Sequence, residues 1–211
     1  YPQSENSVAA IFASSLEKLQ QKKLYGYLVH HFEFYQSHPQ LWEKMKDLKA
    51  EGKIDKIGFS LYNTDQLQYL LDNEVVFDVL QFPYNLFDRQ FDTYLLYLKQ
   101  CGVEIHTRSV FLQGLFFKNV RKLTDKLLPM KKYLEKLHEY CGISGISMEQ
   151  LALNYVVSHP NIDGVLIGVD NCQQLQANVD ALQNGLRQED IDFISSINVS
   201  EKELLNPVNW K

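Results

Sequence analysis

Short, nearly continuous apolar segments alternate along this chain with longer stretches of helical periodicity. The segment Leu24–His30 (LYGYLVH) has no polar alternation, which predicts a strand buried on both faces. Similar segments predict further strands at 54–60, 77–81, 103–109 and 164–169. Helices are expected at Leu41–Ala50, around Leu67–Leu71, at Phe91–Gln100, at Pro129–Tyr140 and at Met148–Val157. Strands that alternate with helices are typical of an α/β fold with a parallel sheet.

Five parallel strands fit either an open sheet or part of a closed barrel. The residues after the first strand (HFEFYQSHP) contain no glycine, whereas an open dinucleotide-binding sheet has a glycine-rich loop there. The pattern therefore favours a TIM (β/α)8 barrel, which needs eight strands and about 250 residues. Because a helix is expected before the first strand, we expect residues 1–211 to form one domain with about five of the eight βα units, roughly three N-terminal strands being absent.

The composition is that of an ordinary globular protein, with 45% hydrophobic and 22% charged residues. A net charge of −5 argues against nucleic acid or an anionic membrane as a main partner. No apolar stretch approaches the ~20 residues of a membrane-spanning helix. Cys101, Cys141 and Cys172 lack metal-binding spacing, so we expect reduced thiols, no metal site and a cytoplasmic location.

His30 stands at the end of the first predicted strand. In a barrel the chemistry lies at the carboxyl ends of the strands, where an imidazole can meet substrate. A histidine that only bonds the backbone at a strand end is the alternative, and the residues alone favour it. His31 is a weaker candidate, because alternation along a strand turns it the other way.

Several segments resemble the aldo-keto reductase family, in the family's order and over essentially the whole chain. LYGYLVH is similar to the strand that ends in that family's active-site histidine, and EGKIDKIGFS to its next helix end and strand. DVLQFPYN carries a glutamine, Gln81, where the family has one. HTRSVFLQGL resembles the pyrophosphate-binding loop, and IGVDNCQQLQANV resembles the last strand and the helix at the adenosine end.

The resemblance implies that the parent protein reduces aldehyde or ketone carbonyls to alcohols with NADP or NAD. Of the family's catalytic aspartate, tyrosine, lysine and histidine, only the histidine falls in this sequence, as His30, which would orient the carbonyl. The other three are expected before Tyr1, so this chain alone is expected to be poorly active or inactive. The alternative is a non-catalytic regulatory or sensor barrel that binds the cofactor.

The resemblance also assigns contacts to the nicotinamide and the pyrophosphate. Ser60 and Gln81 would hold the carboxamide, although Leu61 replaces the family's usual asparagine. Arg108 stands where many members stack an aromatic ring on the nicotinamide, and a guanidinium can stack there or reach a phosphate. The pyrophosphate would lie against the segment after this strand, at Ser109, Phe111, Gln113 and Gly114. Phe111 could instead be a loop-core residue.

At the adenosine end, Gly168, Val169 and Gln174 occupy positions where NADPH-selective members have groups that bind the 2′-phosphate. None of the three is charged, so the choice between NADP and NAD stays open. Asn178 matches the asparagine expected near the adenine, and the helix that begins near Cys172 offers its N-terminus to an anion. The expected partner is a small-molecule carbonyl substrate, and the protein is expected to be a monomer or a weak homo-oligomer.

Overall fold

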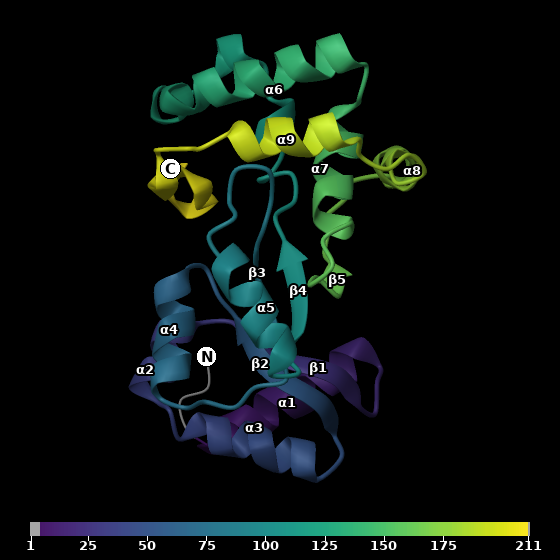
Figure 1. Ribbon diagram of the computed structural model, residues 1–211. Helices are drawn as coiled ribbons and strands as arrows, with labels where there is room; N and C mark the ends of the chain where they lie inside the picture. Colours follow the sequence, from purple (N-terminus) through teal and green to yellow (C-terminus); the bar gives the residue numbers. More distant parts are fainter. Residues whose placement is uncertain (1–4, 211) are drawn as a thin grey trace. The chain divides into compact units, whose positions relative to one another are not determined.

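The computed structural model describes residues 5–210, which divide into two compact units (Figure 1). The first unit comprises the residues up to Phe82 together with Leu96–Ile105, and the second comprises Pro83–Leu95 and the residues from His106 onward. Whether the chain folds as one domain stays a prediction. No helix of the described residues is long and apolar enough to cross a membrane.

Strands and helices alternate along the described residues. In chain order they are α1 (Glu5–Leu19), β1 (Leu24–Val29), α2 (Phe32–Ser37), α3 (Leu41–Ala50), β2 (Ile54–Ser60), α4 (Thr64–Asp72), β3 (Val79–Pro83), α5 (Asp92–Gln100), β4 (Glu104–Arg108), α6 (Lys131–Ser144), α7 (Met148–Val157), β5 (Gly164–Val165), α8 (Cys172–Ala181) and α9 (Gln188–Ser196). Short 3-10 helices cover Leu115–Phe117, Val120–Lys122, Asp125–Met130, Lys202–Leu205 and Pro207–Trp210.

The strands form one sheet in the order β1-β2-β3-β4-β5, and the pairs β1–β2, β2–β3 and β4–β5 are parallel. The predicted parallel α/β sheet is therefore confirmed. The second strand matches the prediction, and the boundaries of the other strands differ from it. The first strand ends at Val29 rather than 30, the third covers 79–83 rather than 77–81, and the fourth covers 104–108 rather than 103–109. The last strand ends at Val165 rather than 169. The last strand is short because its partner β4 ends at Arg108, one residue beyond the pair Thr107–Val165.

The prediction that the first strand is buried on both faces is wrong. Tyr25 in β1 is 58% exposed, and the strand has no fully buried residue. Among the described residues β1 pairs only with β2, so its second edge carries no strand neighbour. Hydrophobicity along the chain reports the composition of a strand and not the number of its neighbours.

Two helices end in the same left-handed glycine cap, at Gly52 after α3 and Gly102 after α5, with φ of 73° and 78°. In each case the next residue's N–H bonds back to the helix, Lys53 to the Leu48 carbonyl and Val103 to the Leu98 carbonyl, both at 3.0 Å. This bond satisfies a carbonyl left open at the helix end.

The core of the first unit is aromatic. The Trp42 ring of α3 stacks on Phe59 of β2 at 4.5 Å, and Tyr35 of α2 meets Phe59 edge-on at 4.9 Å. Phe59 is fully buried. These rings attach α2 and α3 to the face of β2, which holds the carboxyl ends of β1 and β2 in place.

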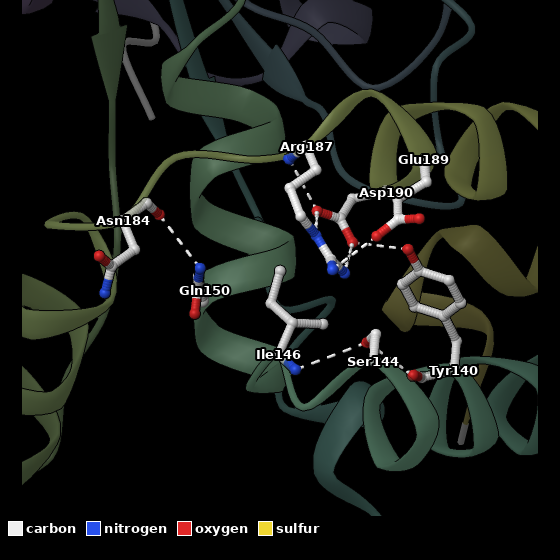
Figure 2. Close-up of polar contacts among 8 residues, drawn as sticks. All are labelled: Tyr140, Ser144, Ile146, Gln150, Asn184, Arg187, Glu189 and Asp190. Carbon is white, nitrogen blue, oxygen red and sulfur yellow. Dashed lines mark hydrogen bonds and ion pairs between the residues drawn. The ribbon is translucent and has the colours of Figure 1, made fainter.

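In the second unit a polar cluster joins α6 to α9 (Figure 2). The Tyr140 hydroxyl donates to Asp190 Oδ1 at 2.5 Å, and the Arg187 backbone N–H donates to Asp190 Oδ2 at 2.7 Å. The Tyr140 ring also stacks on Phe193 at 3.8 Å. Asp190 is 1% exposed, and bonds from the Arg187 guanidinium lower its pKa despite the burial. The charge-assisted contacts keep α9 against α6.

Candidate functional site

His30, Ser60 and Gln81 lie at the carboxyl end of three neighbouring strands of the first unit. The register pairs Val29 of β1 with Phe59 of β2, so the next residues along the chain are His30 and Ser60. Ser60 in turn pairs with Gln81 of β3. Ser60 is buried, and its hydroxyl lies 3.4 Å from Gln81 Oε1. His30 is exposed and meets the ring of His31 edge-on at 4.9 Å. An imidazole, a hydroxyl and an amide thus share one edge of the sheet.

Leu61, which replaces the family's usual asparagine, turns its side chain into the core, where it is fully buried. Its backbone N–H donates to the Gln81 carbonyl at 2.7 Å. The next residue, Tyr62, donates its N–H to Gln66 Oε1 at 2.7 Å. The position therefore supplies packing, and the loop after β2 is fixed by Gln66.

Gln66 was not singled out from the sequence, although a signal for it exists. Asn63 caps α4 by accepting from the Gln66 N–H at 3.0 Å, while the Gln66 side chain bonds back to Tyr62. The same Asn-x-x-Gln pattern opens α8, where Asn171 accepts from the Gln174 N–H at 2.9 Å and Gln174 Oε1 accepts from the Asp170 N–H at 2.8 Å. The reciprocal bonding is a variant of the capping box, in which the glutamine at the third helical position accepts from the residue before the N-cap rather than from the N-cap itself.

The second unit contains a cavity of about 1040 Å³. All nine cofactor residues that the resemblance assigned within this unit line it: Arg108, Ser109, Phe111, Gln113, Gly114, Gly168, Val169, Gln174 and Asn178. They come from the loop after β4, the loop after β5 and helix α8, up to 70 positions apart in the chain. The fold thus brings together two segments that the sequence analysis assigned separately.

One wall of this cavity is a loop with unusual backbone angles. Ser109, Leu112 and Gln113 have φ of 63°, 47° and 49°, and Gly114 has φ of 76°. Non-glycine residues rarely adopt such angles, and the resulting strain is held by the surroundings. The buried Asn85 donates from Nδ2 to the Ser109 carbonyl at 3.1 Å, and Leu112 is fully buried.

Asn85 is a second residue that the sequence analysis missed. Its Oδ1 accepts from the backbone N–H groups of Phe87 and Asp88, both at 3.0 Å, which forms an Asx turn after β3. The signal is the Asn in PYNLFD, a typical turn residue directly after a strand. Its bond to Ser109 joins positions 24 apart, so no local pattern predicts it.

The opposite wall is formed by the end of β5 and the first turns of α8. Gly168 and Val169 follow the strand, and Asn178 is buried at 5% exposure. The side-chain oxygen of Gln174 accepts a hydrogen bond from the Asp170 N–H, so this residue acts first as a helix cap. Among the residues lining the cavity, Arg108 is the cation and Glu149 and Asp170 are the anions.

A parallel sheet with helical connections and polar groups at its carboxyl edge defines an α/β protein. The chain belongs to the aldo/keto reductase family, whose family model matches residues 2–199. Solved structures have the same fold. The aldo-keto reductase AKR11C1 from Bacillus halodurans matches with a TM-score of 0.74 in its apo form, covering 94% of this chain and 71% of that one at 20% identity. Its holo form matches with a TM-score of 0.73. The predicted fold class is confirmed.

Three curated relatives are between 25% and 27% identical to the chain. The chain is 25% identical to the NADH-specific methylglyoxal reductase of Escherichia coli over 89% of its length, which covers 63% of that protein. It is 27% identical to L-galactose dehydrogenase of Arabidopsis thaliana, covering 54% of it. It is 26% identical to glyoxal reductase of Bacillus subtilis, covering 68% of it. The chain spans between about half and two thirds of the length of these relatives.

Proposed function

We propose that the protein is an oxidoreductase that reduces aldehyde or ketone carbonyls to alcohols with a nicotinamide dinucleotide. Membership of the aldo/keto reductase family supports the reaction class. The observation that carries the proposal is the cavity of about 1040 Å³ in the second unit. Its volume is at the upper end of the range of about 300–1,000 Å³ that is usual for ligand sites.

The residues around this cavity fit the phosphate and adenosine parts of a dinucleotide. Gly114 and Gly168 leave open space, since a Cβ added at either would have no neighbour within 4 Å. Arg108 can pair with a phosphate, and the first N–H groups of α8 favour an anion. Phe111 and Phe117 add apolar surface for a ring or a ribose. Backbone donors, one cation and apolar walls are the groups that such a ligand requires.

The residues of the first unit suit the nicotinamide and the carbonyl. A hydroxyl and an amide, on Ser60 and Gln81, can bond a carboxamide group and so fix which ring face is presented. His30 can donate a hydrogen bond from its imidazole to the carbonyl oxygen, where negative charge develops during reduction. The bound dinucleotide would supply the hydride.

The identity of the substrate is not set by these residues. Two relatives are named as reductases of methylglyoxal and glyoxal, which makes small dicarbonyl compounds the first substrates to try. We further infer a cytoplasmic protein, monomeric or weakly self-associating, with no nucleic-acid or membrane partner. The net charge of −5 supports the absence of polyanionic partners.

Titration of the full-length parent protein with NADH and NADPH, followed by addition of methylglyoxal, tests the proposal. We expect saturable binding of at least one dinucleotide and loss of the reduced nicotinamide when methylglyoxal is added. The variant Gln81→Leu, which removes the amide and keeps the size, should weaken binding by about tenfold. Binding without turnover of any carbonyl would favour the regulatory or sensor barrel instead. Failure to bind either dinucleotide would contradict both.

A further inference from the structure

The buried side chain of Asn85 connects two segments of the second unit through both ends of its amide. Asn85 follows β3 and is 0% exposed. Its Oδ1 accepts from the N–H groups of Phe87 and Asp88 within its own turn, whereas its Nδ2 donates to the Ser109 carbonyl in the loop after β4. Asn85 is not among the residues that line the cavity, so its effect on that site passes through the loop.

The bond to Ser109 lies where the pairing of β3 with β4 gives way to the loop. The Tyr84 N–H donates to the Arg108 carbonyl at 3.0 Å, as in a sheet. At the next residue, Ser109, φ is 63°, and a strand does not continue through a left-handed residue. The Asn85 amide therefore bonds the carbonyl of the first residue outside β4, at 3.1 Å.

The Ser109 carbonyl also begins the turn that shapes the cavity loop. It accepts from the Leu112 N–H at 2.9 Å, and Leu112 has φ of 47° and a fully buried side chain. Phe111, Gln113 and Gly114 lie within or directly after this turn and line the cavity. A serine in the left-handed region is strained, so Ser109 relaxes toward negative φ when its carbonyl loses a donor. Such a change redirects the loop that follows.

We propose that Asn85 is a positioning residue for the dinucleotide, an inference that rests on the proposed function. Its Nδ2 holds the Ser109 peptide in the strained conformation in which residues 109–114 face the ligand. The loop is then ordered before the dinucleotide binds, so the entropy cost of ordering it does not reduce the affinity.

A purely structural role for Asn85 predicts different behaviour. In that case the amide stabilises only its own turn, and its loss lowers the free energy of unfolding without a specific effect on the loop. Asn85→Asp separates the two roles, because a carboxylate has the shape of the amide and keeps an acceptor for the turn but has no donor for Ser109. Asn85→Ser is a second variant, whose hydroxyl accepts in such a turn and which introduces no buried charge.

The test measures dissociation constants for NADH and NADPH in the full-length parent protein and its variants. Each Asn85 variant should weaken dinucleotide binding by about tenfold. In a Ser109→Gly background the same changes should weaken it by less than about threefold, because glycine adopts positive φ without strain and needs the Asn85 donor less. The control is Asn119→Asp, at an exposed position of the same unit where the side-chain oxygen accepts from the Arg121 N–H at 2.9 Å. It should leave the constants unchanged.

Hydrogen–deuterium exchange without dinucleotide provides a reading that is independent of binding. Residues 109–117 should exchange faster in both Asn85 variants, whereas faster exchange confined to residues 84–90 would show a purely structural role. Unchanged dissociation constants in both variants, or an equal loss with and without Ser109→Gly, would overturn the role of Asn85 and leave dinucleotide binding intact. If the unaltered protein binds neither dinucleotide, the proposed function itself is wrong and this role falls with it.

Discussion

Asp88 is a buried carboxylate in the turn after β3, with 2% of its surface exposed. Burial raises its pKa to about 6, although the Gln90 side chain and backbone donate to it and partly oppose this shift. Because the raised pKa belongs to the folded state, Asp88 holds its proton more tightly there than in the unfolded chain. Its contribution to stability is therefore present at low pH and is lost as the pH rises through about 6.

The substitution Asp88→Asn should remove this pH dependence. The amide keeps an acceptor for Gln90 and has no charge to bury. We expect the unfolding free energy of the variant, relative to the unaltered protein, to rise by up to about 3 kcal/mol between pH 4 and pH 7. Urea unfolding of both proteins at a series of pH values measures the difference. A difference that stays constant with pH would show that burial does not perturb this carboxylate.

Gln174 offers a residue-scale test of dinucleotide preference. The sequence analysis finds no cation at Gly168, Val169 or Gln174, and an arginine that pairs with a 2′-phosphate gains a charge-assisted bond. Gln174→Arg should shift the ratio of NADPH to NADH affinity toward NADPH by about tenfold or more. Dissociation constants for both dinucleotides measure the shift.

The matched control for Gln174→Arg lies on the same helix. Gln176 also bonds an aspartate four residues away, Asp180, at 2.8 Å, but it does not line the cavity. Gln176→Arg adds the same charge and should leave the ratio unchanged. An equal shift in the two variants would show a general effect of charge rather than a contact at position 174.

At the scale of elements, the loop after β4 in the second unit has a strained backbone. Gly114 has φ of 76°, and a Cβ there would meet no neighbour. Gly114→Ala should therefore cost only the backbone strain of the left-handed region, about 1–2 kcal/mol. Gly142 lies inside α6 and also has open space around it, so Gly142→Ala should stabilise the protein by about 0.5–1 kcal/mol. In thermal unfolding we expect the midpoint temperature to fall in Gly114→Ala and to rise in Gly142→Ala. Two shifts of the same sign would contradict the strain.

Elements were more predictable from the sequence than the contacts between them. The ranges of α3 and α7 match the prediction residue for residue, since apolar spacing and end residues are local properties. The length of β5 was not predictable, because it depends on where β4 ends. The exposure of β1 depends in the same way on the number of its neighbours.

The candidate site could be named from the sequence only with the help of the family resemblance. Arg108, Gly114 and Asn178 carry no local signal that they share a cavity, and the structure places them around one. Asn85 was missed for a physical reason. Its role arises from a position distant in the chain, the Ser109 carbonyl.

At the scale of the molecule, the central claim is that the cavity of the second unit binds a nicotinamide dinucleotide. Hydrogen–deuterium exchange with and without saturating NADH or NADPH tests it most directly, because it reports the backbone that contacts the ligand. We predict slower exchange at residues 109–117 and 168–178, with exchange in α6 unchanged. Protection confined to other segments, with these two unaffected at saturation, would contradict the account.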